Sequence, residues 1–434
     1  MTVLSRRELL KRGAGLALAT GAGSLVSLDR LWTPAAAAGG LLRKGISLSG
    51  PGALTVDDHP DDYRLWGNRE YIRDFSNTKW VKLWVSWYDL QQGLEFAPAS
   101  RNDSWRQLNT APDGAGWIRR LDRQIRAVNA DRLGILLGVF HDNPTWATGA
   151  TGPDPVYPRK PAAWHRPLDV SVESPWGWFI AYLCARYARG VPANPIGPHA
   201  LEPGEDASGY NPLFGNPEGA VIDAIEIANE PNYIAWPQEG IIDFTAQMVE
   251  SACAIAKTWR GPRVLVPGSV DFPDAPYSND QGIIGTWWYE FTQGLLAALD
   301  GFRPEVPVAW SHHNYRDVKL QEIPTRTERM LELLRASGWV DDPQPLWLTE
   351  SGINMGSSYQ NPAAQLNQAR VIERNFFRMM RLPEVFVWMQ HGIHDKPGNT
   401  FHSGLRNDFV YGSGPGTPRP AWYTWRELPG SPIM

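Results

Sequence analysis

The chain has 434 residues, of which 41 are Lys or Arg and 46 are Asp or Glu, so its formal net charge at pH 7 is −5. Charged residues make up 20% and hydrophobic residues 43% of the sequence, which excludes a mainly disordered chain. The negative net charge excludes a generally basic surface for nucleic acid. The length fits two ordinary domains or one large α/β barrel.

The first 38 residues have the pattern of an export signal. Ser5-Arg6-Arg7 precedes a mildly apolar run over residues 13–28, and small residues follow at 35–38. This order is typical of a twin-arginine signal peptide, with a short amphipathic helix or a membrane anchor as the alternative. The apolar run is short for a membrane span, which needs about 20 apolar residues. We therefore predict a secreted protein without stable membrane insertion after cleavage.

Removal of this segment takes away five basic and two acidic residues, which would leave a mature chain with a net charge of −8. The two cysteines, Cys184 and Cys253, both lie in helix-like segments. They form either a disulfide or two buried free thiols. The sequence has no Cys-rich metal motif, and we expect no cofactor.

Eight short apolar segments alternate with helix-like segments from residue 41 onward. The predicted strands cover residues 45–49, 80–87, 134–141, 224–229, 263–269, 308–315, 345–350 and 385–390. Several are continuously apolar, as parallel strands buried on both faces are. Between them, apolar residues recur with helical spacing, as at Trp117, Leu121, Ile125 and Val128, and at Leu366, Ala369, Ile372, Phe376 and Met379.

This alternation predicts a (β/α)8 TIM barrel, one α/β domain over residues 41–430. A doubly wound sheet is the alternative, but Ser49-Gly50-Pro51-Gly52 after the first strand does not match its Gly-rich turn. The longest loops after strands cover residues 88–115, 142–175 and 391–420. In a barrel these loops emerge on the C-terminal face, where active sites lie.

Two glutamates stand at the ends of predicted strands, Glu230 after the fourth and Glu350 on the seventh. Each alone would be interpreted as a surface or ion-paired acid. As a pair on one face of a barrel they match the chemistry of glycoside cleavage, in which one acid protonates the leaving oxygen and one carboxylate attacks or activates water.

The motifs around these glutamates resemble those of glycoside hydrolase clan A, which comprises retaining (β/α)8 glycosidases. The segments concerned are NEPN at 229–232, TESG at 349–352, WVKLWVSW at 80–87, NPTWA at 143–147 and HHNY at 312–315. Trp236 after the first motif favours a family 39-like member, and the His-x-Tyr motif suits family 5 equally. The resemblance implies hydrolysis of a carbohydrate substrate, with Glu230 as general acid/base and Glu350 as nucleophile.

The resemblance also implies roles for neighbouring residues. Asn229 would hydrogen-bond the sugar 2-hydroxyl, and Tyr315 would donate to Glu350 and keep it ionised. Alternation along a strand puts His313 on the same face as Tyr315, although a core histidine is the alternative. His141 could bind a sugar hydroxyl or cap a loop. Tryptophans at strand ends and in the following loops could stack on sugar rings: Trp84, Trp87, Trp146, Trp236 and Trp388.

Lys82 departs from the clan, which has Arg at this position. Lys is a point charge where Arg is a planar fork. It could lower the pKa of the nucleophile, or it could point into the barrel and pair with Glu226. By contrast, Trp176 and Trp178 lie in a helix-like segment beside Phe179 and are expected to pack.

Two other functions fit the same barrel. One is a glycan-binding protein that has lost catalysis, which the intact acid pair argues against. The other is a metal-dependent hydrolase that uses His391 and His394 next to Asp395. The His-x-His motif common on the first strand of such hydrolases is absent from residues 45–49.

Overall fold

The computed structural model describes residues 42–48, 69, 72–73, 77–91, 97–110, 112–150, 165–188, 220–233, 236–271, 277–278, 284–320, 322–338, 342–395, 401–407 and 416–429. These residues belong to a compact unit that spans Gly40–Met434. The predicted export signal at residues 1–38 lies outside the described residues and stays a prediction. No helix in the described ranges is both long and apolar enough to cross a membrane.

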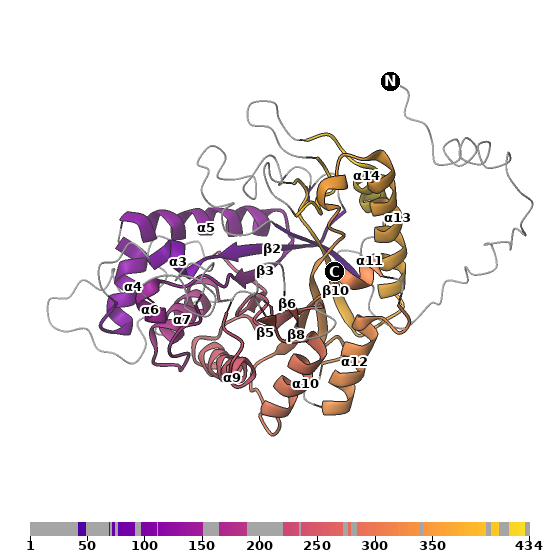
Figure 1. The fold of residues 1–434 in the computed structure, drawn as a ribbon. Coiled ribbons are helices and arrows are strands. Elements are labelled where there is room, and N and C mark those ends of the chain that lie inside the picture. Colours follow the sequence, from indigo (N-terminus) through magenta and orange to yellow (C-terminus); the bar gives the residue numbers. More distant parts are fainter. Residues whose placement is uncertain are drawn as a thin grey trace, which may run out of the picture. The chain divides into compact units, whose positions relative to one another are not determined.

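Eight parallel strands close into a barrel in the order β1-β10-β9-β8-β5-β4-β3-β2 (Figure 1). Each lies within three residues of its predicted ends, which confirms the (β/α)8 prediction. The strands are β1 Arg43–Ser47, β2 Trp80–Val85, β3 Gly134–Val139, β4 Ala224–Glu226, β5 Arg263–Val270, β8 Val308–His313, β9 Leu346–Ser351 and β10 Val385–His391. A separate antiparallel pair, β6 Tyr277–Ser278 and β7 Ile284–Gly285, follows β5.

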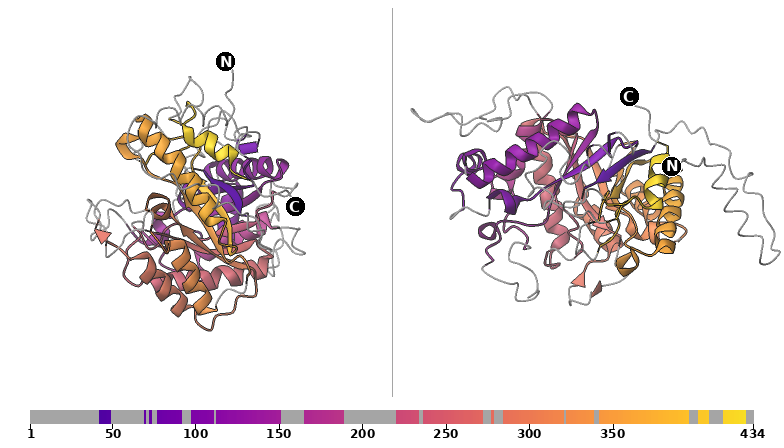
Figure 2. Two further views of the ribbon diagram at one scale, coloured as in Figure 1. Left: turned by 90° about the vertical axis from the view of Figure 1, so that its right-hand side faces the viewer. Right: turned by 90° about the horizontal axis from the view of Figure 1, so that it is seen from above.

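Helices lie outside the strands, as the three ribbon views show (Figures 1 and 2). They are α3 Trp87–Gln91, α4 Arg101–Thr110, α5 Pro112–Ala130, α6 Thr145–Thr148, α7 Pro175–Tyr187, α9 Ile241–Trp259, α10 Trp288–Ala298, α11 Tyr315–Lys319, α12 Arg326–Ser337, η5 Gly356–Ser358, α13 Pro362–Met379 and α14 Pro420–Glu427. Local sequence explains several helix starts. Ser174 caps α7, Asn361 caps α13, and Thr325 forms a capping box with Glu328 at α12.

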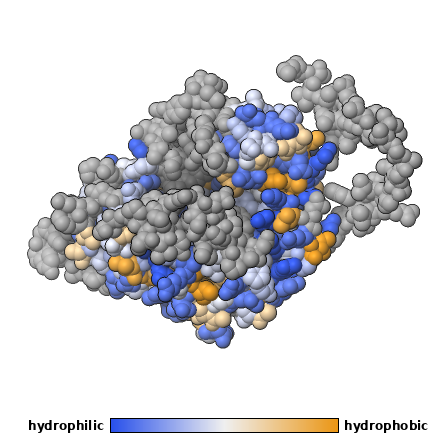
Figure 3. Space-filling model, in the orientation of Figure 1, coloured by the Kyte–Doolittle hydropathy of each residue, from blue (hydrophilic) through white to orange (hydrophobic). Residues whose placement is uncertain are grey.

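The main core lies between the strands and the helices. Leu121, Ile125 and Val128 of α5 are buried in it, as the helical spacing predicts. In α13 the predicted stripe holds except at Leu366, which is 44% exposed near the start of the helix. Trp176 of α7 is buried, as predicted. On the face drawn in Figure 3, hydrophobic residues are scattered among hydrophilic ones over the described surface, as is usual for a protein surface.

Lys44 of β1 anchors the C-terminal helix. Its side chain is fully buried, and its Nζ donates to the carbonyl oxygens of Trp425 at 2.6 Å and Leu428 at 2.9 Å. Carbonyl groups at the end of a helix lack partners within the helix, so the lysine satisfies the end of α14. Burial and the charge of Lys79 lower the pKa of Lys44 to about 7.

Cys184 of α7 and Cys253 of α9 are buried free thiols. Of the two possibilities for this pair, the structure therefore shows the thiols. Burial raises the pKa of each to about 12, which keeps both protonated and unreactive.

Candidate active site

Inward-facing side chains build the site in layers. An apolar cluster inside the barrel includes Ala224, Ala309 and Trp347, with Trp80 packed against it. Side chains on one face of a strand recur at every second residue. Two residues further along the same strands come four buried polar residues, which we name the polar layer: Lys82, Glu226, Ser311 and Thr349.

The polar layer satisfies a fully buried carboxylate. Lys82 Nζ forms a salt bridge with Glu226 Oε2. Glu226 Oε1 accepts hydrogen bonds from Ser311 Oγ and, at 3.1 Å, from Thr349 Oγ1. Gly268 of β5 leaves the necessary space, because a Cβ there would lie 2.6 Å from Glu226 Oε1. A buried charge with these partners is stable where a lone one would not be.

Glu350 reaches the interior because β9 carries a bulge. His312 of β8 pairs with Leu348, but His313 pairs with Glu350, so Thr349 is an extra residue in the ladder. A bulge places two residues of one strand opposite one of its neighbour and redirects their side chains. Thr349 and Glu350 therefore both contact the buried Lys82–Glu226 pair, one through Glu226 and the other through Lys82.

Glu350 is held by two donors. Tyr315 Oη donates to Glu350 Oε2 at 2.6 Å, and Lys82 Nζ donates to Oε1 at 3.1 Å. The hydrogen bond from Tyr315 is the contact expected from the sequence. Lys82 makes both contacts considered for it, since the same ammonium group bridges Glu350 and Glu226. A single lysine thus joins the carboxylate at the site to the carboxylate beneath it.

Glu230 lies four residues beyond the end of β4, in a backbone conformation that residues other than glycine rarely adopt. Its φ is 46°, and its N–H donates to the Gly268 carbonyl at 3.1 Å. Non-glycine residues in this region cost about 1–3 kcal/mol and are frequent at functional sites. One carboxylate oxygen of Glu230 and one of Glu350 lie within 4.8 Å of each other. The structure therefore brings the two predicted glutamates together.

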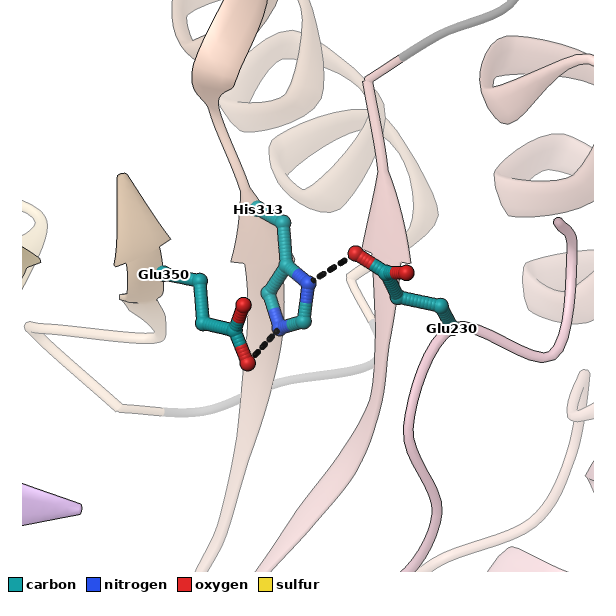
Figure 4. Close-up of side chains that lie close together, drawn as sticks. All are labelled: Glu230, His313 and Glu350. Carbon is teal, nitrogen blue, oxygen red and sulfur yellow. Dashed lines mark hydrogen bonds and ion pairs between the residues drawn. The ribbon is translucent and has the colours of Figure 1, made fainter. Parts of the chain in front are cut away.

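His313 lies between these glutamates (Figure 4). Its Nδ1 is 2.7 Å from Glu230 Oε1, and its Nε2 is 3.9 Å from Glu350 Oε1 and 3.7 Å from Glu226 Oε1. The ring is fully buried, so it has no exposed surface for the substrate contact predicted from the sequence. It touches carboxylates instead, and its effect is on their protonation.

The surroundings move the two carboxyl pKa values apart. Burial raises the pKa of Glu230, and the charge of Glu350 adds to this, against the opposing effect of His313. Burial alone would also raise the pKa of Glu350. The charges of His313, Lys82 and His391 and the hydrogen bond from Tyr315 outweigh it and lower this pKa. The two shifts have opposite directions, so Glu230 holds a proton more readily than Glu350 does.

His313, between Glu230 and Glu350, and Glu226, beneath them, are both expected to be charged. Burial would lower the pKa of His313, but Glu350 and the other carboxylates raise it to about 9. Burial would raise the pKa of Glu226, but Lys82 and His313 lower it to about 2. Two cations therefore face two carboxylates when Glu230 is protonated. Because this set of four groups is then neutral, Glu230 is the glutamate of the pair that binds a proton more readily.

Asn229 is buried beside Glu230, and its Oδ1 has no hydrogen-bond partner among the described residues. A buried amide oxygen without a partner is costly, so it is available to accept from a ligand hydroxyl. This arrangement is compatible with the predicted contact to a sugar hydroxyl, which stays a prediction.

Three of the predicted tryptophan platforms are packed in the core instead. Trp388 is fully buried, lies near Phe376 of α13 and Trp425 of α14, and donates to Asn314 Oδ1 at 3.3 Å. Trp236 donates to the His141 carbonyl at 2.9 Å, and Trp87 stacks on Phe179. Both are at most 2% exposed. The sugar-stacking prediction is wrong for these three because each ring is covered by its own neighbours.

The other predicted binding residues lie at the carboxyl ends of β2 and β3. The Trp84 ring carries Lys82 Nζ 3.9 Å above its centre and is 5% exposed. Trp146 in α6 is half-buried and lies edge-on to Trp87, with ring centres 5.5 Å apart. His141 is half-buried, and its ring lies against Phe140. Trp146 therefore keeps accessible surface for a ligand, whereas both ring nitrogens of His141 are buried.

The metal cluster of the alternative hydrolase, His391, His394 and Asp395, does not form among the described residues. Asp395 is ion-paired with Arg419 and lies 3.3 Å from His402, and His391 Nδ1 lies 3.0 Å from Ser403 Oγ. Within the described ranges, one group of His, Cys, Asp or Glu is close enough to hold a metal, and it consists of Glu230, His313 and Glu350. Lys82 lies 3.1 Å from Glu350, and an ammonium there repels a metal cation. We assign no metal to this group.

The sequence pattern does not single out Ser311 and Thr349. Counting back two residues from His313 would have placed Ser311 on the inner face. Counting back two residues from Glu350 leads to Leu348 and misses Thr349, because the bulge lets consecutive residues of β9 face inward.

No model of a known protein family matches this sequence, and no curated protein matches it. Solved structures do share its fold. A hyperthermophilic β-glucosidase mutant is similar with a TM-score of 0.50 and 14% identity, over 89% of this chain and 99% of that one. Xylanase 10B from Thermotoga petrophila, solved with xylobiose, gives a TM-score of 0.47 and 12% identity over 94% and 98% of the chains. The β-glycosidase of Thermosphaera aggregans gives 0.47 and 13% over 89% and 95%.

At 14% identity, the likeness to the β-glucosidase shows only the TIM-barrel fold that the strand order already defines. A barrel of this kind hosts many activities, so the function depends on the residues of the site.

Proposed function

We propose that this chain is a secreted retaining β-glycosidase that hydrolyses O-glycosidic bonds of a carbohydrate substrate. The observation that carries the proposal is the spacing of Glu230 and Glu350, whose nearest carboxylate oxygens lie within 4.8 Å. Retaining glycosidases hold their two carboxyl groups about 5–5.5 Å apart, whereas inverting enzymes need about 6.5–9.5 Å to admit a water molecule. The short spacing supports double displacement.

In the first step Glu350 attacks the anomeric carbon while Glu230 donates its proton to the glycosidic oxygen. The bond from the anomeric carbon to that oxygen breaks, the alcohol leaves, and a glycosyl ester forms on Glu350. In the second step the ionised Glu230 takes a proton from water, and the resulting hydroxide displaces Glu350. Both carboxyl groups return to their starting protonation, and the anomeric configuration is retained.

The electrostatics support this assignment of roles. Lys82 and Tyr315 hold Glu350 ionised, as a nucleophile requires. Burial and the Glu350 charge raise the pKa of Glu230, as a general acid requires. The opposite pKa shifts also favour catalysis over a barrel that only binds glycans, because binding alone needs no such separation.

We assign the sugar contacts to residues that follow the carboxyl ends of the strands next to Glu230. Asn229 would hydrogen-bond the 2-hydroxyl, and Trp146 and His141 would line the approach from the β3 side. Trp84 would contribute only the edge that remains exposed. Secretion through the twin-arginine signal is part of the proposal, and changing Arg6 and Arg7 together to Lys should retain the protein inside the cell if it is correct.

Covalent trapping tests the proposed mechanism directly. A panel of 2-deoxy-2-fluoro-β-glycosides with activated leaving groups slows the second step more than the first, so the ester should accumulate. Peptide mass mapping should place the label on Glu350, while Glu350→Gln should remain unlabelled. Glu305→Gln, which changes an exposed acid paired with Lys257, is the matched control and should label normally. Hydrolysis with inversion, observed by NMR, would overturn the proposal.

A further inference from the structure

Asp271 is a buried acid at the carboxyl end of β5, outside the set that touches the proposed reaction. Its backbone N–H donates to the His313 carbonyl at 3.0 Å. Its Oδ2 accepts from the backbone N–H groups of Arg316 at 2.7 Å and Asp317 at 3.3 Å. The side chain is fully buried, so these bonds are not shared with solvent.

These two N–H groups belong to the first turn of α11, whose first residue is Tyr315. The first N–H groups of a helix have no partner within it and need a capping side chain. The residue at the cap position, Asn314, makes no such bond to α11, because its side chain bonds Thr327, Ser351 and Trp388. Asp271 supplies the missing cap from a neighbouring strand.

A second acid fixes the same helix from its other side. Asp317 Oδ1 accepts from the Arg326 N–H at 2.8 Å, and its Oδ2 accepts from the Thr327 N–H at 2.9 Å. These are the first residues of α12. The short α11, five residues long, is thereby tied to β5 through Asp271 and to α12 through Asp317.

The position of α11 decides whether Tyr315 reaches Glu350. Its phenol oxygen lies 2.6 Å from Glu350 Oε2, and hydrogen bonds weaken steeply once the distance or angle departs from the optimum. Without a bond to Asp271, the first turn would lose the partner of two N–H groups and could move by more than this contact tolerates.

We propose that Asp271 is a positioning residue for the nucleophile, and that it acts by holding the first turn of α11 so that Tyr315 donates to Glu350. The role of Glu350 rests on the proposed function. The other groups that face Glu350 are Lys82 from β2, His313 from β8, His391 from β10 and Glu230 from the loop after β4. Asp317 and Arg326 are the charged groups that face Asp271.

The test compares Asp271→Ala, Asp271→Asn, Tyr315→Phe and the double variant Asp271→Ala/Tyr315→Phe. Loss of the phenol should raise the pKa of Glu350 and move the acid limb of kcat/KM to higher pH by about one unit. Asp271→Ala should move it in the same direction, and the double variant should match Tyr315→Phe alone. Asp271→Asn keeps an acceptor oxygen and should stay within threefold of the wild type. Additive effects in the double variant would overturn the proposal.

Thr325→Ala is a matched control for instability. It removes the cap of α12 and leaves the bonds of Asp271 intact, so it should lower the melting temperature without moving the acid limb. An acid limb that shifts as much in Thr325→Ala as in Asp271→Ala would assign the effect to general loosening and overturn the proposal.

A measurement without substrate separates this inference from the proposed function. 3-Fluorotyrosine at position 315 gives a 19F signal that should titrate with Glu350. Asp271→Ala should change the chemical shift and its pH midpoint, and Asp271→Asn should not. If no glycoside is turned over but this pattern holds, the proposed function fails and the positioning role stands. If the 19F signal is the same in Asp271→Ala and wild type, the positioning role fails whatever the activity.

Discussion

Thr349 and Glu350 are consecutive in β9, and yet both side chains face the interior of the barrel. The bulge in β9 permits this, so that Thr349 donates to Glu226 and Glu350 accepts from Lys82. A regular strand would point one of the two toward the helices. The position of Glu350, the proposed nucleophile, and the hydrogen bond from Thr349 to Glu226 therefore both depend on this bulge.

An external nucleophile should restore turnover in a variant that lacks Glu230, the proposed general acid/base. Glu230→Ala should lower kcat on unactivated β-glycosides by a factor of about 10²–10⁴, the usual contribution of general acid–base catalysis. Substrates with good leaving groups should still form the ester on Glu350, and azide should then attack it without base assistance. The expected product is a β-glycosyl azide, identified by NMR. An α-azide, or no rescue at any azide concentration, would contradict the assignment.

The charge of Lys82 should set the lower pH limit of activity. Lys82→Met removes the cation beside Glu350 and leaves Glu226 without its ion pair. The pKa of Glu350 should rise, and the acid limb of kcat/KM should move to higher pH with at least a tenfold loss at neutral pH. Lys82→Arg keeps the charge and should lose less. Lys257→Met, an exposed ion-pair partner of Glu305, should leave the profile unchanged. An unmoved acid limb in Lys82→Met would contradict this prediction.

Activity should survive complete removal of divalent metal. The carboxylates of the site already face Lys82 and His313, so they need no metal to balance their charge. Dialysis against EDTA should change kcat/KM by less than twofold, and metal analysis should give well below one ion per chain. Loss of activity with recovery on addition of Zn2+ would instead favour a metal-dependent hydrolase, with Glu230, His313 and Glu350 as ligands in place of the His391 and His394 of the original alternative.

Lys44 should make the free energy of unfolding increase with pH above about pH 7. Its pKa is about 7 in the folded protein against about 10.4 in an unfolded chain. Between these values the unfolded state holds one more proton, so this group makes the free energy of unfolding rise with pH by up to about 1.4 kcal/mol per unit. Below about pH 7 the Lys44 ammonium group is charged in both states, so the full cost of burying its charge lowers the free energy of unfolding.

Urea unfolding at pH 6, 8 and 9.5 checks this. Lys44→Met should lack this part of the slope, so that the wild type gains stability relative to the variant as pH rises. The variant should be least stable relative to the wild type at pH 9.5, where most of the cost of burying the charge is gone and the Trp425 and Leu428 carbonyls still lack their donor. Lys257→Met is the control and should keep the wild-type slope. Parallel curves for Lys44→Met and wild type would refute the prediction.

The barrel could be predicted because its signals are local. Parallel strands buried on both faces are apolar throughout, and helices between them show a separate period, so all eight strands were found in the sequence. The failures share a cause. Trp87, Trp236 and Trp388 stand at or near strand ends like the residues of the site, but sequence position does not tell which side of a strand an indole covers.

The sequence predicts which residues meet at the candidate site. It does not predict the hydrogen bonds and ion pairs between them. Glu230, Glu350 and Tyr315 follow from motif and spacing. His313 is buried between two carboxylates, and Lys82 contacts both Glu226 and Glu350. These contacts depend on how far along the barrel axis residues of different strands lie. The bulge in β9 and the positive φ of Glu230 leave no mark in hydrophobic periodicity.

The pairing of β1 with β10 has a consequence for how the protein folds. Arg43 lies opposite Val387 in this ladder, so the barrel closes through contacts between nearly opposite ends of the chain. Contacts this distant along the chain form slowly, because a long loop must be ordered first. Until then β1 and β9 each present an unpaired edge that can join another chain. We expect a chain that ends before β10 to aggregate, with no partly active shorter form.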